Sequence, residues 1–146
     1  MSIKLVPYLT FENTKEALQY YQDVFGATDV YRISPTAKQA EDLSLNADVN
    51  LEDLTFQAGF KLLGLDVQCA DSFYGQTVIS STVSLMLQVN LKDADETQAL
   101  KDLYNRLVKS DEVKVLITLD KKTTGNIYGQ IVDKYGITWI FNAVKE

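Results

Sequence analysis

Apolar and polar residues alternate along two stretches of the chain, residues 3–11 and 82–90. A period of two predicts a β-strand with one buried face in each stretch. Pro7 removes one backbone donor from the first strand, so we expect a distortion or an unpaired edge at that point. The buried faces would carry the strongly apolar side chains of Leu5, Leu9, Leu85, Leu87 and Val89 and meet the helices that follow.

Each of these strands is followed by the start signal of a helix. Asn13 can cap a first helix with Glu16 three residues on, and Asp93 with Glu96 repeats the pattern in the second half. Gly26 follows the last apolar position of the first helix and is typical of a helix C-terminus. The two apolar stripes consist of Ala17, Leu18, Tyr21, Val24 and Phe25, and of Leu100, Leu103, Tyr104, Leu107 and Val108.

The remaining segments predict strands, a short helix and two hairpins. We expect strands at 27–33 and 112–119, and a polar surface helix from Ser34-Pro35 to about Leu43. A first hairpin would pair residues 54–57 with 60–66 around Ala58-Gly59, followed by a loop over 68–75. A second would pair 130–133 with 137–143 around a turn at 134–136 that ends on Gly136.

The order strand, capped helix, strand and hairpin occurs twice, at an offset of about eighty residues. It predicts an α+β fold of two βαβββ modules, residues 1–67 and 82–146, joined by a linker over 68–81 into one compact domain. One helix covers only one face of each sheet. We therefore expect the two sheets to form a curved mixed sheet, a half-barrel with the helices outside and a concave cavity inside.

Charge and composition exclude several classes of function. The net charge is −6 and Lys and Arg never occur in runs longer than two, so nucleic acid is not an expected partner. No apolar run approaches membrane-spanning length, and the first residues do not form a signal peptide, so we expect a cytoplasmic protein without a membrane partner. Cys69 is the single cysteine and the chain has no histidine, so neither a disulfide nor a Cys–His pair can form.

The strand faces opposite the apolar ones predict the wall of a cavity. They combine apolar area with a few polar groups, as small-molecule sites do. An alternative is that this face is covered by the other half or by a second chain. Trp139 falls on the helix side and is expected in the core. The candidate ligand-binding residues are Tyr8, Thr10, Asp66, Ser84, Met86, Gln88, Thr138, Ile140 and Asn142.

Several motifs resemble those of a known family. They are the run 7–11, the helix from Glu16 to Tyr21 leading into residues 24–27, Leu63-Gly64, the run 83–85, and the run 133–139 with Asn142. Together they resemble the PhnB-like group, also called demethylubiquinone methyltransferase-like. This group belongs to the vicinal oxygen chelate superfamily of glyoxalase, bleomycin resistance and dioxygenase relatives. The resemblance covers nearly the whole chain except residues 36–50.

The resemblance implies paired βαβββ modules and a homodimer, but not the metal chemistry of many relatives. Metal-dependent members place His, Gln or Glu at positions that match Val6, Gly64, Ser84 and Ile140 here. None of these four is a strong metal ligand, so we expect no metal. We find no glycine-rich strand–loop–helix segment for a methyl-donor nucleotide and expect no cofactor.

Three hypotheses remain open from the sequence. The first is a metal-free protein of unknown activity that binds a small, partly apolar molecule in the cavity. The second is a metal-free enzyme in which Asp66, Tyr8 or Gln88 acts by proton transfer or oxyanion stabilisation. The third is a homodimeric interaction module without a ligand.

Overall fold

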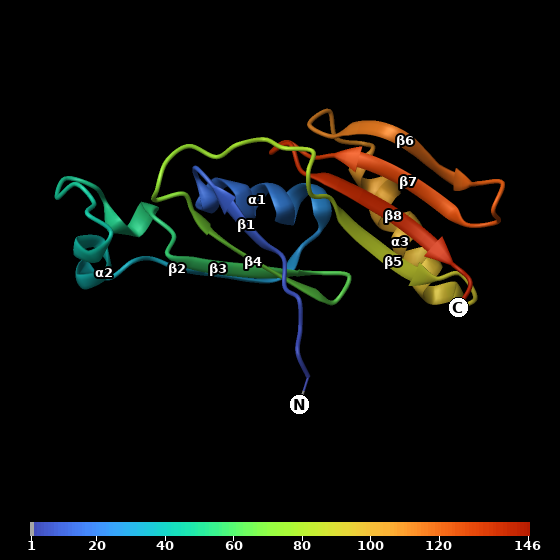
Figure 1. Ribbon diagram of the computed structural model, residues 1–146, viewed down its shortest axis with the longest axis horizontal. Helices are drawn as coiled ribbons and strands as arrows, with labels where there is room; N and C mark the ends of the chain where they lie inside the picture. Colours follow the sequence, from blue (N-terminus) through green and yellow to red (C-terminus); the bar gives the residue numbers. More distant parts are fainter. Residues whose placement is uncertain (1) are drawn as a thin grey trace. The chain divides into compact units, whose positions relative to one another are not determined.

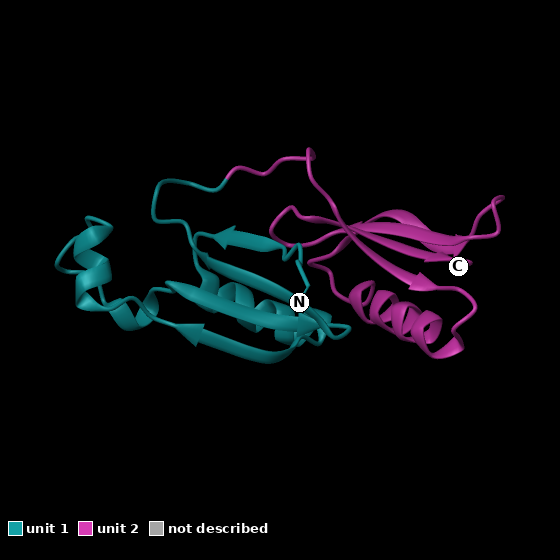
Figure 2. Cartoon of the chain, turned by 60° about the horizontal axis from the view of Figure 1, so that its bottom comes forward, with its two compact units in different colours: residues 1–77 teal, residues 78–146 magenta. Residues whose placement is uncertain are grey.

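The computed structural model describes residues 2–146, which divide into two units with the boundary between residues 77 and 78 (Figure 2). Each unit is a four-stranded mixed sheet with one long helix packed against it (Figure 1). The α+β class and the two βαβββ modules are therefore confirmed. The joining of the two sheets into one half-barrel stays a prediction.

The first unit has the sheet order β1-β4-β3-β2. Strands β1 and β4 run parallel, and the other neighbours run antiparallel. The long helix α1 contacts all four strands, so the core of this unit lies between α1 and one sheet face. The elements are β1 (Tyr8–Phe11), α1 (Thr14–Phe25), β2 (Thr28–Ile33), α2 (Ala37–Asp42), the 3-10 helix η1 (Leu51–Asp53), β3 (Gln57–Leu62) and β4 (Leu65–Asp71).

The second unit repeats this order as β5-β8-β7-β6, again with one parallel pair, β5 and β8. Its helix α3 packs mainly on β5 and β8. Among the described residues, β6 forms ladder hydrogen bonds on one side only, because it is the last strand of its sheet. The elements are β5 (Leu85–Asn90), α3 (Ala94–Leu107), β6 (Lys114–Lys121), β7 (Ile127–Val132) and β8 (Thr138–Val144).

Both long helices begin where their caps predict, and α1 also ends where Gly26 predicts. The Asn13 side chain accepts a hydrogen bond from the Glu16 amide at 3.2 Å, and Gly26 closes α1 in the left-handed conformation at φ 72°. The Asp93 carboxylate accepts from the Glu96 amide at 3.1 Å at the start of α3. In the first core, the ring of Tyr21 stacks on that of Phe60 with 5.1 Å between their centroids. Capping and the apolar stripes are therefore confirmed, except at Val108, which is the C-cap of α3 and is 39% exposed.

The first strand of each unit is shorter than the alternation predicts. Strand β1 begins at Tyr8 and β5 at Leu85, whereas Leu5 and Val83 lie outside the strands and are 99% and 71% exposed. The expectation that Leu5 packs against a helix was wrong. Alternation indicates which face of a sheet a residue would take, but a strand also needs a hydrogen-bonding partner. Strand β4 forms hydrogen bonds with the N-terminal segment only from Pro7 onward.

The first hairpin turns five residues later than predicted. Its turn lies at Leu63 and Gly64, both with positive φ, 51° and 78°, as a tight two-residue hairpin turn requires. Gly59 instead lies inside β3, where a Cβ atom would approach the Tyr31 ring to 2.7 Å. Gly59 therefore makes room for a neighbouring ring and does not form the turn, so the hairpin around Ala58-Gly59 was wrong.

This shift also moves the end of the first module. Strand β4 continues to Asp71, four residues into the segment expected to be a linker, and the first unit extends to residue 77. The Asp71 carboxylate explains why the chain is fixed there. It accepts hydrogen bonds from the amides of Thr14 and Thr55, both at 2.8 Å, and so joins the end of β4 to the start of α1 and to the segment before β3.

The segment between β2 and β3 is a surface excursion, as its polar composition indicates. Its helix α2 is capped by Thr36, not by Ser34, because Thr36 and Gln39 form a reciprocal capping box. The Arg32 guanidinium fixes the return of this segment by donating to the carbonyl oxygens of Leu54 and Glu52 at 2.9 and 2.8 Å. Arg32 therefore determines where this excursion rejoins the sheet.

The closing hairpin of the second unit forms as predicted. Its turn ends on Gly136, which has a φ of 82°. The buried carboxylate of Asp133 accepts from the amides of Tyr135 and Ile137 at 2.8 and 3.1 Å through Oδ1, and from Trp139 Nε1 at 2.9 Å through Oδ2. Trp139 is 1% exposed, so its predicted place in the core is confirmed.

Candidate functional site

The two faces of each sheet differ as the alternation predicts. In β1, Phe11 is buried against α1, whereas Tyr8 and Thr10 point to the other face and are exposed. In β8, Trp139 and Phe141 are buried, whereas Thr138 and Ile140, which alternate with them, are half-buried. We call the face without the helix the open face of each sheet.

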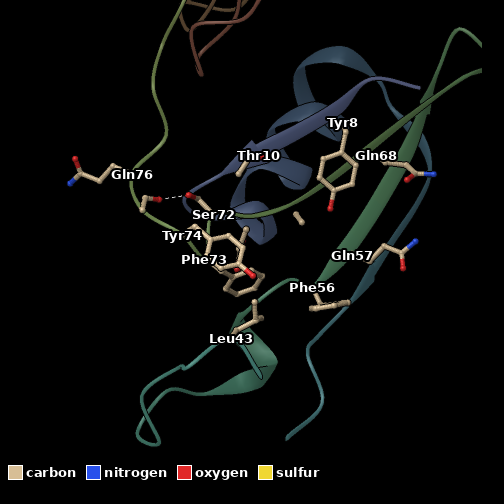
Figure 3. A pocket seen from close by; sticks show the side chains of 13 residues that line it. Tyr8, Thr10, Leu43, Phe56, Gln57, Gln68, Ser72, Phe73, Tyr74 and Gln76 are labelled. Atoms are coloured by element: carbon tan, nitrogen blue, oxygen red, sulfur yellow. Dashed lines mark hydrogen bonds between the residues drawn. The ribbon is translucent and has the colours of Figure 1, made fainter. Parts of the chain in front are cut away.

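A pocket of about 510 Å³ lies on the open face of the first sheet (Figure 3). Its floor comes from β1, β3 and β4, and its sides come from Leu43 of the surface excursion and from the segment 72–76, which we call the strap. The lining residues are Tyr8, Thr10, Leu43, Phe56, Gln57, Gln68, Ala70, Asp71, Ser72, Phe73, Tyr74, Gly75 and Gln76.

The strap is fixed beside the end of β1. The Ser72 amide donates to the carbonyl oxygen of Phe11 at 2.8 Å, and the Thr77 hydroxyl donates to the Glu12 carboxylate at 3.1 Å. Within the strap, the Ser72 hydroxyl donates to the Gly75 carbonyl oxygen, the dashed line in Figure 3. These contacts hold Phe73 and Tyr74 beside the open face, and Tyr74 is 90% exposed there.

The pocket offers neutral polar groups that the protein itself does not use. Among the described residues, the side chains of Tyr8, Thr10, Gln57 and Gln68 form no hydrogen bond with the rest of the chain. Asp71 is the one lining residue with a carboxylate, and both its oxygens are occupied by backbone amides. The pocket can therefore hold a partly apolar molecule and orient it by hydrogen bonds.

Two of the nine predicted site residues, Tyr8 and Thr10, line this pocket. Asp66 does not, although it also belongs to β4. Its side chain is 48% exposed and forms an ion pair of 3.1 Å with Lys61 on the neighbouring strand. Asp66 is therefore exposed to solvent, paired with a lysine and outside the pocket, so it is not placed to act on a molecule bound there.

The other six predicted residues belong to the second unit. Met86 and Gln88 of β5 lie in register with Ile140 and Asn142 of β8. The Asn142 amide donates to the Gln88 side-chain oxygen at 3.0 Å and contacts the Met86 sulfur at 3.8 Å. Thr138 begins β8, and Ser84 precedes β5 and is exposed. The structure thus brings together four of these residues on the second open face.

Residues of the pocket that sequence reasoning missed are Phe56, Gln57, Gln68 and the strap. Gln68 was assigned to a loop, although it continues the alternation of Asp66 on the open face of β4. Gln57 was predicted to precede a turn at Ala58-Gly59, which does not form. The period of two, continued to Asp71, would have indicated Gln68 and Ala70, whereas no local pattern indicates that the strap lies beside the end of β1.

The donor groups present do not fit the metal site of the metal-dependent relatives. Gly64 lies in the β3–β4 turn and brings no side chain, and Val6 and Ile140 are apolar. Over residues 2–146, no three His, Cys, Asp or Glu side chains come close enough together to hold a metal ion.

Over residues 2–146, no helix combines the length and the apolar character that crossing a membrane requires.

The Cys69 thiol belongs to the core and not to the pocket. It lies on the helix side of β4 and is fully buried. Burial, and secondarily the nearby Asp71 carboxylate, raise the pKa of Cys69 from its usual 9.0 to about 12. The thiol is therefore protonated at neutral pH and cannot act as a nucleophile there.

Comparisons with known proteins agree with this fold. Residues 3–141 match the family described as 3-demethylubiquinone-9 3-methyltransferase. Protein YjdN of Escherichia coli (strain K12) is 25% identical over 148 residues, which cover 97% of this chain and 96% of YjdN.

Two solved structures are similar in fold. One is the putative 3-demethylubiquinone-9 3-methyltransferase, PhnB protein, of Bacillus cereus, with a TM-score of 0.62, 20% identity, and 97% and 99% of the two chains covered. The other is the fosfomycin resistance protein FosX of Listeria monocytogenes, with a TM-score of 0.62, 12% identity, and 98% and 94% covered. The chain thus belongs to the 3-demethylubiquinone-9 3-methyltransferase family, the PhnB-like group that its motifs resemble, and it has the fold of glyoxalase (vicinal oxygen chelate) proteins.

Proposed function

We propose that the protein binds a small, partly apolar molecule in the pocket under the strap. The observation that carries this proposal is the pocket itself, which joins aromatic side chains to neutral polar groups without partners in the described chain. Its volume of about 510 Å³ falls within the usual range of ligand sites, about 300–1,000 Å³. Aromatic area would supply affinity, and the polar groups would fix the orientation of the ligand.

Binding is better supported than catalysis by proton transfer. Asp66, the carboxylate suggested as a base, is outside the pocket and paired with Lys61. Tyr8 lines the pocket, but the carboxylate that lines it too, Asp71, already accepts two backbone hydrogen bonds. A proton acceptor for Tyr8 would have to come from the ligand. The enzyme hypothesis therefore has less support than the binding hypothesis.

Filling the pocket is expected to abolish binding. Thr10 is exposed on the open face of β1 and lines the pocket, so the indole ring of a Thr10→Trp variant would occupy its space. A strand accepts tryptophan well, so the fold should persist. We expect native mass spectrometry of the freshly purified wild-type protein to show a retained small molecule, and the Thr10→Trp protein to lack it.

Thr28→Trp is the matched control for this experiment. Thr28 is an exposed threonine at the start of β2 in the same sheet, and it does not line the pocket. The control should retain the molecule as the wild type does. An identical spectrum for wild type and Thr10→Trp, with or without an adduct, would contradict the proposal.

The homodimer stays a prediction, and the outer strand β6 supports it. Val115, Leu116 and Ile117 are 39%, 47% and 36% exposed on a strand whose outer backbone groups have no ladder partner in the described chain. We propose that a second copy covers this strand. Sedimentation equilibrium of the wild-type protein should give twice the chain mass of 16.4 kDa, and the Leu116→Lys variant should give a mass closer to that of a single chain. A wild-type mass of a single chain at high micromolar concentration would overturn this proposal.

A further inference from the structure

The lining of the pocket restricts the charge of its ligand. Among the lining residues there is no lysine or arginine, and Asp71 is 8% exposed with both carboxylate oxygens occupied by the amides of Thr14 and Thr55. The pocket therefore provides no free counter-ion for an anion or for a cation. Moving an unpaired charge out of water is costly, so a charged ligand would bind poorly.

The aromatic side chains of the pocket restrict the shape of the ligand. Tyr8 of β1, Phe56 before β3, and Phe73 and Tyr74 of the strap come from three separate segments around one space (Figure 3). On the helix side of the sheet, the aromatic rings contact one another, as Tyr21 does with Phe60 and Phe25. Over the described residues, the four pocket rings form no such pair. Their faces and edges are free to contact a flat ring system.

The polar side chains of the pocket restrict which hydrogen-bonding groups the edge of the ligand can carry. Gln57 and Gln68 each carry an amide that can donate and accept, and neither has a hydrogen-bond partner in residues 2–146. Gln68 is half-buried and lies in register beside Tyr8, so its amide would lose water when the pocket fills. A ligand that offers only an acceptor or only a donor would leave half of this amide unpaired.

We infer that the pocket takes an uncharged, flat ring compound with an amide-like group at its edge. This inference rests on the proposed binding function and narrows it to one chemical class. The aromatic side chains would contact the ring, and the amide of Gln68 would pair with the donor and acceptor of the ligand. Gln76, also part of the lining, points away from the other side chains (Figure 3), so we assign it no role.

A series of probes with one ring system and three charge states tests the class. We would titrate the full chain with 2-naphthamide, 2-naphthoate and 2-naphthamidinium at neutral pH and follow naphthalene fluorescence. The neutral amide should bind at least tenfold more tightly than either ion. Decahydronaphthalene-2-carboxamide, tested by calorimetry, should bind more weakly than 2-naphthamide because its rings are not flat.

Gln68→Leu should weaken the binding of 2-naphthamide about tenfold and leave the binding of plain naphthalene unchanged, whereas Gln98→Leu on the exposed side of α3 should change neither. Binding of either ion as tight as that of the amide would overturn the ligand class and leave the binding function in place. The same holds if no probe binds while native mass spectrometry finds a retained molecule that Thr10→Trp loses. Absence of both probe binding and a retained molecule would overturn the class and the proposed function together.

Discussion

Replacing Asp133 by alanine is expected to lower the free energy of unfolding of the second unit by at least about 3 kcal/mol. The carboxylate is 4% exposed and accepts hydrogen bonds from two turn amides and from the Trp139 indole. Alanine would leave three donors without their acceptor, the buried Trp139 indole and two part-buried turn amides, and each unsatisfied donor costs about 1–3 kcal/mol, least where water can reach it. The turn before β8, and with it the central pairing of β7 and β8, should loosen.

Urea unfolding followed by tryptophan fluorescence measures this effect directly, because Trp139 is the single tryptophan and lies in the second unit. Asp120→Ala is the control in the same unit. Asp120 is also a carboxylate, but its side chain is 62% exposed in an ion pair with Lys122, so its loss should cost less than about 1 kcal/mol. Equal midpoints for Asp133→Ala and Asp120→Ala would show that the hydrogen bonds of Asp133 do not stabilise the unit.

The Cys69 thiol is expected to react about a thousandfold more slowly in the folded protein than in the unfolded chain. The thiolate is the reacting species, and burial raises the pKa of Cys69 from 9.0 to about 12, which lowers the thiolate fraction at pH 8 about a thousandfold. The core position of the side chain would slow the reagent further. Because the folded pKa is the higher one, this group adds stability that is intact below pH 9 and is lost as the pH rises toward 12.

Ellman's reagent at pH 8, with and without 8 M urea, tests this prediction on the wild-type protein. Cys69→Ala gives the background, since the chain has one cysteine. Modification of the folded protein at the rate of the unfolded chain would contradict the core position of the thiol. Such a result would also reopen the question of a reactive cysteine beside Asp71.

The sequence contains enough local information for the elements of the fold. The caps at Asn13 and Asp93 and the stop at Gly26 act within one helical turn, so the helices could be predicted closely. Strand ends depend on distant partners. Leu5 and Val83 continue an alternating pattern but lie outside the strands. Gly59 was taken for a turn because its real role, making room for Tyr31 of a different strand, is not visible locally.

The candidate site was predictable only in part for the same reason. Tyr8 and Thr10 follow from the alternation of β1, because a strand of known register shows which side chains leave the core. The strap was not predictable, since its position depends on the contacts of Ser72 with Phe11 and of Thr77 with Glu12. The excursion that brings Leu43 to the pocket is the segment that the family motifs in the sequence do not cover. The strap and the surface excursion are the parts of this pocket that a βαβββ module alone would not provide.

The most direct test of the central claim is a map of amide chemical shifts in a ¹H–¹⁵N NMR titration with 2-naphthamide. The pocket under the strap predicts saturable shifts at Tyr8, Thr10, Gln57, Gln68 and residues 72–76, with the amides of the second sheet unchanged. Shifts centred instead on Gln88 and Asn142 would move the binding site to the second open face and contradict the claim.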